Sequence, residues 1–288
     1  MSATGQVFAG GIIGGWTAAG SQTVTGCSNS GWIYTKQRTT SYHNDINVGD
    51  TPTPLWSFFG GISGMGGSYT NEGLNGGYNT ITGKTFTHCT NTGRILIYGK
   101  VRSCIGGVVA YTENDPDGCV CTANITLHKS GGIGSVTTGS STNYHREIVG
   151  GVVGLCTATS VSNAKYDGTL TSYGSSPQAY DGGIIGYTYK FNSAGTSITL
   201  SNCKVGGSFR STGSGGCAIM CWSASGNVVN FTFTDCVIKK GTINYTTGSK
   251  VTINSDSDVA KNHCLGKDSG SATITDNVLP TVATSIDD

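Results

Sequence analysis

Short runs of Val and Ile alternate with glycine-rich and polar segments along most of the chain. These apolar residues do not follow the i, i+3, i+4 spacing of an amphipathic helix, so the pattern predicts that helices are rare. It predicts instead strands of about four to six residues, which Gly and Asn interrupt at turns. The sequence therefore indicates an all-β protein.

A glycine-rich phrase, Gly-Gly-Ile-Ile-Gly, repeats along the chain with small changes. Its copies lie at residues 10–14, 60–64, 106–110, 150–154 and 182–186, and a degraded copy lies at 215–219. Successive copies begin 50, 46, 44, 32 and 33 residues apart. Such self-similarity is typical of arrays whose units bury their apolar faces only by stacking. We predict one elongated β-solenoid, a parallel β-helix with inserted loops.

A second phrase, Cys-x-Asn-x-Gly, alternates with the first. It is clear at residues 27–31 and 89–93, and weaker echoes begin at 163, 202 and 235. Its Asn and Gly are expected to form a left-handed turn. Glycines at corners are expected to let the backbone turn with positive φ, and the paired glycines of the first phrase are expected to let neighbouring walls approach closely. The Val/Ile pair between them is expected to send one side chain to the core and one to an outer layer.

The length of one coil sets the expected shape. With coils of roughly 20–30 residues, each rising by the ~4.8 Å of strand pairing, about eleven coils would form a rod about 50 Å long.

The chain has 11 cysteines and no Cys-x-x-Cys motif, which argues against a zinc ribbon or a thioredoxin-like site. Cys27, Cys89, Cys203 and Cys236 share one place in the repeat. Because equivalent positions stack in a solenoid, we predict an internal ladder of buried thiols. A scatter of disulfides is the alternative.

The composition limits the classes of partner that the protein is expected to bind. Lys and Arg number 17 and Asp and Glu number 16, so no broad field attracts nucleic acid or an anionic membrane. No run of 18 apolar residues predicts a transmembrane helix, and the first residues do not resemble a signal peptide. The chain is then either cytosolic or a mature protein whose leader is absent from this sequence.

The predicted layout is a single β-solenoid domain over residues 1–279. Insertions interrupt it at 35–59 and 65–79, and terminal coils at 242–279 cap it, because an open solenoid end exposes unpaired strand groups. Residues 280–288 are expected to be a mobile tail or a linker.

Over residues 7–243, the alternation of Cys-x-Asn-x-Gly-x-Ile with Gly-Gly-Ile-Ile-Gly resembles the GLUG-type repeats of Bacteroidetes surface proteins. The uneven period and the long insertions depart from that family. The resemblance implies an adhesin-like β-solenoid at the cell surface or secreted. The family has no shared catalytic residues, so none can be transferred to this chain.

The first insertion carries the candidate binding site. Its candidate ligand-binding residues are Tyr42, His43, Asp45 and Trp56. An aromatic ring beside polar groups suits a sugar, which needs an apolar face and hydrogen bonds at its rim. The alternative is that Trp56, Phe58 and Phe59 fill the core.

The sequence predicts no catalytic residues, no cofactor and no metal site. Calcium binding at the acidic segments 114–118 and 254–258 is the less favoured interpretation, because both lack a complete calcium-loop pattern. A polysaccharide-degrading enzyme would need clustered acids or bases near Asp45, Asp50 or Arg146.

The leading functional prediction is a non-enzymatic bacterial adhesin, on the cell surface or extracellular, that presents its wall and loops to a glycan or a host or cell-surface protein. One alternative is a polysaccharide-degrading β-helix enzyme. The other is a structural subunit that associates end to end, as in a fibre or a phage appendage.

Overall fold

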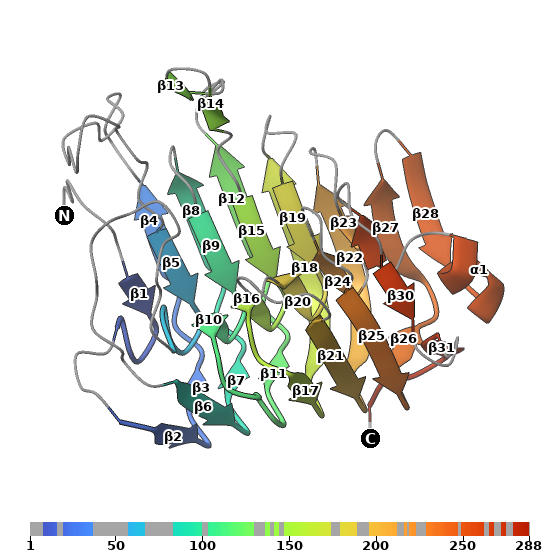
Figure 1. The fold of residues 1–288 in the computed structure, drawn as a ribbon, viewed down its shortest axis with the longest axis horizontal. Helices are drawn as coiled ribbons and strands as arrows, with labels where there is room; N and C mark the ends of the chain where they lie inside the picture. Colours follow the sequence, from blue (N-terminus) through green and yellow to red (C-terminus); the bar gives the residue numbers. More distant parts are fainter. Residues whose placement is uncertain are drawn as a thin grey trace.

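The computed structural model shows a β-solenoid whose short strands stack in parallel sheets along one long axis (Figure 1). The described residues are 8–15, 20–36, 57–66, 83–99, 103–129, 136–138, 141–143, 147–173, 179–188, 196–211, 216–217, 219–222, 229–246, 249–261, 265–267, 272–274 and 279–287. Strands from successive parts of the chain follow one another along the axis, from blue to red. The predicted all-β solenoid is confirmed.

One wall, which we call the glycine sheet, contains the copies of the glycine phrase. Its parallel strands are β1 (Phe8–Gly10), β5 (Ser57–Gly60), β9 (Ser103–Gly106), β15 (Glu147–Gly150), β19 (Ala179–Gly182) and β23 (Gly216–Cys217). The register aligns the first glycine of each phrase, from Gly10 to Gly182. Each coil therefore holds one copy of the phrase.

Two further walls follow the glycine phrase. One contains β10 (Val109–Thr112), β16 (Val153–Cys156), β20 (Ile185–Thr188), β24 (Met220–Trp222) and β29 (Leu265–Lys267). The other contains β17 (Ser160–Ser162), β21 (Thr196–Ser201), β25 (Val229–Thr234) and β30 (Ala272–Ile274), while β2 (Gln22–Thr25) pairs with β6 (Lys84–Thr87). A small antiparallel hairpin, β13 (Val136–Thr138) and β14 (Ser141–Asn143), projects beyond the walls (Figure 1).

The remaining wall, which we call the large sheet, contains the second phrase. Its short strands are β3 (Ser28–Asn29), β7 (Thr90–Asn91) and β11 (Val120–Cys121), and its longer ones are β4 (Ile33–Lys36), β8 (Ile95–Gly99), β12 (Ile125–Lys129), β18 (Lys165–Tyr173) and β22 (Lys204–Ser211). In later coils, β18 and β22 span the positions that two strands occupy in earlier coils. The coil is closed when the chain leaves this sheet for the glycine sheet.

The number of coils differs from the expectation of about eleven. The glycine sheet has six strands in the described part of the chain, so the chain passes through that wall six times. Each coil contains both phrases, because the second phrase lies in the large sheet of the same coil that begins in the glycine sheet. The repeat intervals of 50 to 32 residues are therefore whole coils with turns of different length.

The paired glycines are required for close approach. A Cβ built on Gly107 would lie 1.8 Å from the carbonyl oxygen of Gly151, and one built on Gly106 would lie 1.8 Å from that of Val109. None of the described paired glycines has a positive φ. The close-approach prediction is confirmed: the chain turns here with ordinary dihedrals, and only the bulk of a side chain is excluded. The positive φ predicted for corner glycines is found at Gly26 and Gly118.

The left-handed turn lies one residue before each cysteine of the second phrase. The residues with positive φ at this corner are Gly26, His88, Gly118, Asn163, Asn202 and Asp235. The predicted left-handed Asn is found in the weaker copies, at Asn163 and Asn202. In the clear copies the left-handed residue precedes the cysteine, and Asn29 accepts a hydrogen bond from the Gly31 amide at 3.1 Å and donates to Asn91 at 2.9 Å. The Asn side chains thus close local turns and link coils.

In the inner coils, the Val/Ile pair of the glycine phrase is buried at both positions, whereas Ile12 of the first coil is exposed. Val108, Val109, Val152 and Val153 all belong to the main apolar core. The prediction that one of each pair faces an outer layer is therefore wrong. A tight corner turns both side chains inward, so each phrase contributes two residues to the core.

The thiol ladder is confirmed. Cys89, Cys203 and Cys236 are buried, Cys27 is partly buried, and the strand register adds Cys119 to the same line. The eight cysteines whose side chains the structure describes are free thiols. The ladder is thus a packing element of the core.

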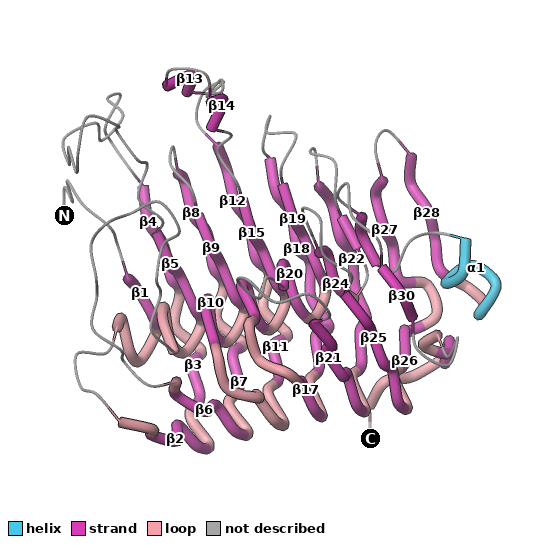
Figure 2. Tube along the Cα trace, viewed as in Figure 1, coloured by secondary structure: helices cyan, strands magenta, loops and turns pink. Residues whose placement is uncertain are grey.

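The C-terminal end is closed by strands and a short helix. The last coil carries β26 (Val237–Lys239) and β27 (Thr242–Thr246), and β28 (Ser249–Ile253) pairs with β27 in the antiparallel sense. The helix α1 (Asp256–Lys261), cyan in Figure 2, follows it. Residues expected to form a mobile tail instead form β31 (Thr281–Ala283), which pairs with β26, and Ile286 is buried. The apolar residues of the tail explain this difference, because they complete the last coil.

Candidate ligand-binding wall

The residues predicted to bind a ligand lie outside the described part of the chain. This holds for Tyr42, His43, Asp45 and Trp56, and also for Asp50 and Arg146. Those assignments stay predictions. Within the same insertion, Phe58 and Phe59 are 0 % and 1 % exposed, so the interpretation that they fill the core is confirmed.

The outward face of the large sheet, from the first coil to β26, is a candidate binding surface, which we call the outer wall. Successive side chains of a strand point to opposite faces. In β8, Ile95 and Ile97 are fully buried, so Leu96 and Tyr98 face outward and are partly exposed. The other long strands of this sheet alternate in the same way.

Aromatic side chains dominate the exposed apolar surface of this wall. Trp32 is 70 % exposed and Tyr34 is 57 % exposed, and Tyr173 is also exposed. Among the described residues, the only other exposed large hydrophobic side chain is Ile12, in the first coil. Exposed apolar groups that gather on one face mark interaction sites more often than scattered ones do.

The strand register places the rings of three successive coils on a single line, and Tyr34, which pairs in register with Leu96, lies beside this line. His128 pairs in register with Tyr98 on one side and with Tyr173 on the other. The ring centroids of Tyr98 and His128 are 4.8 Å apart and those of His128 and Tyr173 are 4.6 Å apart, with interplanar angles of 9° and 10°. Tyr34 meets Tyr98 edge-on at 6.1 Å. These four residues form a continuous aromatic ladder across four coils.

Arginine side chains lie at both ends of the aromatic surface. The Arg94 guanidinium lies 5.4 Å from the ring centroid of Trp32, and that of Arg210 lies 5.8 Å from the ring of Tyr173. Both distances are within the range of a cation–π contact. Each arginine is therefore held in place by the ring that it contacts, and its positive charge lies near the outer surface.

The stacking of the rings determines which chemical groups of the outer wall a ligand can contact. Rings within the ladder cover one another's faces, so their edges, with the phenol hydroxyls and the imidazole nitrogens, face outward. Trp32 differs, because Arg94 covers one side and no described strand lies beyond the first coil on the other. The wall thus offers a row of hydrogen-bonding edges and one broad apolar ring face at its end.

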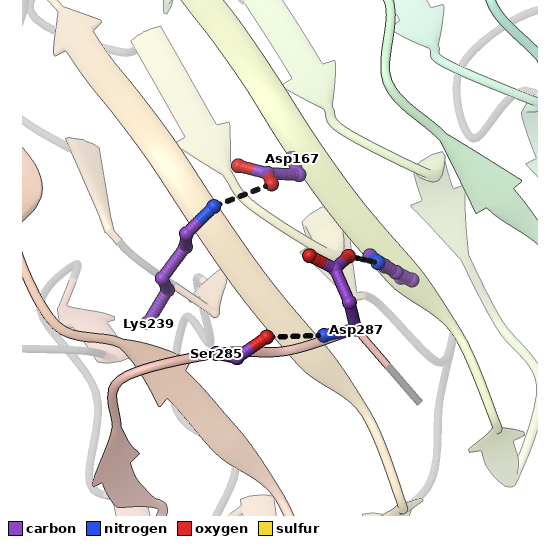
Figure 3. Close-up of polar contacts among 5 residues, drawn as sticks. Asp167, Lys239, Ser285 and Asp287 are labelled. Atoms are coloured by element: carbon purple, nitrogen blue, oxygen red, sulfur yellow. Dashed lines mark hydrogen bonds and ion pairs between the residues drawn. The ribbon is translucent and has the colours of Figure 1, made fainter.

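Two ion pairs lie on the C-terminal half of the outer wall. Lys239 Nζ is 3.0 Å from Asp167 Oδ2 (Figure 3), and Lys165 Nζ is 2.5 Å from Asp287 Oδ1. The hydrogen bond with Asp167 raises the pKa of Lys239, and that with Lys165 lowers the pKa of Asp287. The second pair ties the C-terminal segment to β18.

The acidic turn at residues 114–118 links coils. Asp115 Oδ1 accepts hydrogen bonds from the amides of Thr159 and Ser160 at 2.9 and 2.8 Å. Asp117 Oδ1 accepts one from Asn163 Nδ2 at 2.6 Å. These oxygens bind protein groups of the next coil.

The second acidic segment caps α1. Asp258 Oδ2 accepts from the amides of Asn254 and Ser255, both at 3.0 Å, and Asp256 Oδ1 accepts from the amide of Val282 at 2.6 Å. The bond from the Ser255 amide to Asp258 is one half of the capping box found at helix N-termini. Within the described residues, no three His, Cys, Asp or Glu side chains gather where they would hold a metal ion.

The thiols lie inside the solenoid, away from the outer wall. Burial raises the pKa of Cys121 and Cys156 to about 12. A hydrogen bond from Cys119 lowers the pKa of Cys89 to about 6 and raises that of Cys119. His88 is exposed whereas Cys89 is buried, which confirms that these neighbours face opposite sides. The pair therefore does not form a Cys–His nucleophile.

Sequence reasoning missed the aromatic ladder. Its members come from four coils at the ends of the strands that follow the second phrase, and no local motif marks them. Aligning the second phrase from coil to coil would have found the signal, because Tyr98 and His128 occupy the same place after it.

No protein-family model, curated protein or solved structure matches this chain. The likeness to GLUG-type repeats therefore stays a resemblance of motifs. Among the described residues, no helix is long and apolar enough to cross a bilayer.

Proposed function

We propose that the protein is a non-enzymatic, adhesin-like binding protein of the cell surface or extracellular space. Its outer wall binds a polysaccharide chain that lies along the solenoid axis. The observation that carries this proposal is the aromatic ladder of Tyr34, Tyr98, His128 and Tyr173, with the exposed ring of Trp32 at its end.

The shape of the surface favours an extended ligand. The ladder crosses four neighbouring strands at ~4.8 Å each, so it is about 15 Å long and only one side chain wide. A compact small molecule would contact only part of such a row. A linear polymer along the axis would contact all of it and gain from many weak contacts.

The chemistry of the surface favours a sugar chain. Hydroxyl and imidazole edges offer donors and acceptors to sugar hydroxyls, and the Trp32 ring offers an apolar face to the C–H groups of a sugar ring.

A polysaccharide panel tests this proposal. Binding of the purified chain to neutral and acidic polysaccharides is measured by affinity electrophoresis and titration calorimetry. For the best ligand, we expect Trp32→Ala and His128→Ala each to weaken binding about ten-fold, because a good aromatic contact contributes about 1 kcal/mol or more. The matched control is Gln22→Ala, which removes an exposed side chain from another wall.

The result that contradicts the proposal is equally plain. If no polysaccharide binds, or if the Trp32 and His128 variants bind as the Gln22 variant does, the outer wall is not a polysaccharide site. Turnover of a bound polysaccharide would support the degrading-enzyme alternative, whose candidate residues Asp45, Asp50 and Arg146 stay predictions.

A further inference from the structure

The stacked rings of the aromatic ladder repeat at a fixed distance along the solenoid axis. The ring centroids of Tyr98 and His128 are 4.8 Å apart, and those of His128 and Tyr173 are 4.6 Å apart. Both values are close to the ~4.8 Å spacing of paired strands, because the register places these rings on three neighbouring strands. A ligand that lies along the axis therefore meets one polar ring edge per coil.

This row of ring edges is held in place before any ligand binds. Main-chain pairing joins β12 to β8 on one side and to β18 on the other, which fixes the step from strand to strand. The interplanar angles of 9° and 10° keep the rings nearly parallel, so their outward edges are separated by the same step as their centroids. A row that is already ordered loses little conformational entropy on binding.

The chemistry of the ring edges alternates along the row. Tyr98 and Tyr173 lie two coils apart and end in a phenol hydroxyl, whereas His128 between them presents the nitrogens of an imidazole. The imidazole is also the shorter ring, so its edge lies nearer to the strand than a phenol hydroxyl does. The same group therefore returns after two coils.

We infer that the ligand of the outer wall is an extended, β-1,4-linked polysaccharide that places one sugar residue against each coil. This inference rests on the proposed function and names the class of its ligand. In an extended chain of this linkage, a sugar residue is about as long as the step between coils. Successive residues face opposite ways, so the same groups return after two residues. Both periods match those of the ladder.

Other common linkages do not give this match. Chains with α-1,4 or β-1,3 linkages coil, so their residues advance along the chain axis by less than the step between coils. Chains with α-1,6 linkages are flexible and lose more conformational entropy when they lie along a straight row. The hydroxyls of these chains would meet the ring edges out of step, and hydrogen bonds would be left unmade. The wall is therefore expected to discriminate by linkage.

Oligosaccharides that share a composition and differ in linkage test the inference. Titration calorimetry compares cellohexaose with maltohexaose, isomaltohexaose and laminarihexaose, which are all hexamers of glucose. Chitohexaose, mannohexaose and xylohexaose extend the β-1,4-linked set to other sugars. We expect the best β-1,4-linked hexamer to bind about ten-fold more tightly than any hexamer of another linkage, the difference expected when one or two hydrogen bonds are lost.

The length of the oligosaccharide gives a second measurement. The ladder crosses four coils, from Tyr34 to Tyr173. For the best sugar, affinity is therefore expected to rise from the dimer to the tetramer and to change little beyond the pentamer, because further residues lie past the ladder.

A variant of the middle ring separates stacking from edge chemistry. His128→Phe keeps an aromatic ring between Tyr98 and Tyr173 and removes the polar edge. We expect it to weaken binding of the β-1,4-linked hexamer about ten-fold, because a hydrogen-bonding position is lost. Gln22→Ala, on another wall, is the control and should leave the affinity unchanged. Thermal unfolding checks that both variants fold.

The failures of the two proposals differ. If a hexamer of another linkage binds as tightly as the best β-1,4-linked one, and Trp32→Ala weakens both, the linkage class is overturned and the proposed function stands. Binding that is confined to polysaccharides of another linkage has the same meaning. If His128→Phe leaves the binding of the β-1,4-linked hexamer unchanged, the ring edges do not select the ligand, and this inference is overturned. If no oligosaccharide and no polysaccharide binds, both proposals fail.

Discussion

At the scale of single residues, the solenoid depends on glycines, which carry no side chain, at its corners. The glycine sheet brings backbone against backbone: a Cβ on Gly151 would lie 2.0 Å from the Gly183 carbonyl oxygen, and one on Gly61 would lie 1.9 Å from that of Gly107. Real Cβ atoms do not approach a carbonyl oxygen so closely. The neighbouring strand cannot move away without disturbing its own hydrogen bonds to the next strand. Each glycine is therefore fixed by the coil beside it.

Gly107→Ala tests this dependence. We expect the variant to lose about 3 kcal/mol or more of its free energy of unfolding, because the added methyl meets the Gly151 carbonyl and the Cys121 sulfur at 1.8 and 2.6 Å. Urea unfolding followed by circular dichroism measures the loss. The control is Gly15→Ala, whose Cβ would lie 3.4 Å from Phe8, an ordinary contact. Equal stabilities of the two variants would contradict the close-approach interpretation.

At the scale of elements, register decides what the strands can do. The thiol ladder and the aromatic ladder both arise because equivalent residues of successive coils lie side by side. One ladder faces the core and the other faces outward, since neighbouring positions on a strand alternate between the faces. The same register lets β31 continue the large sheet beyond β26.

The docking of β31 is expected to depend on pH through Asp287. The pKa of Asp287 lies below its ordinary value in the folded chain, because Lys165 hydrogen-bonds to the carboxylate. The pair therefore stabilises docking above the ordinary aspartate pKa of about 4, and this contribution is lost as pH falls through the lowered pKa. We expect Asp287→Asn to speed amide exchange of residues 281–287 at pH 7 and to leave it unchanged at the lowest pH.

Hydrogen exchange read by mass spectrometry measures this effect. Asp235→Asn is the control, because it removes the same charge at an exposed corner. High salt should shrink the difference at pH 7, since the pair is largely solvent-exposed. A difference between Asp287→Asn and the parent chain that persists at low pH would mean that the carboxylate acts by some route other than its charge.

The sequence predicted the elements better than their connections. The spacing of Gly, Val and Ile is local, and it predicted the stacked strands, the close approach of the walls and the buried Cys89 and Cys203. The size of a coil was not predictable in the same way, because turns of very different length separate the two phrases. The left-handed corners at His88 and Asp235 were missed, because a glycine or an asparagine would have been the visible sign there.

The binding wall illustrates the same limit. Tyr98 and His128 are 30 residues apart, and only the register of β8 with β12 stacks their rings at 4.8 Å. A single sequence shows the composition of an insertion, so it directed attention to Tyr42 and Trp56. It does not show which rings from different coils face the same way.

At the scale of the whole molecule, the two ends of the solenoid differ. At the C-terminal end, the antiparallel strand β28 and α1 cover the large sheet (Figure 2), whereas β23, β29 and β30 are the last strands of the other sheets. At the other end, β1, β3 and β4 are edge strands in the described structure, and Ile12 is 48 % exposed. Open edges pair with other strands, whereas capped ends do not. Head-to-tail growth needs pairing at both ends, and the cover over the large sheet hinders it at the C-terminal end.

We expect association instead through the first coils of two copies, which stops at a dimer because both open ends are then covered. Sedimentation velocity over a range of concentrations measures it. Ile12→Lys should shift the chain toward monomer, since it places a charge on the exposed apolar edge, whereas Thr252→Lys on the capped end should have no effect. Species larger than a dimer, or a dimer that Ile12→Lys leaves intact, would show that another surface associates and would return the end-to-end subunit to consideration.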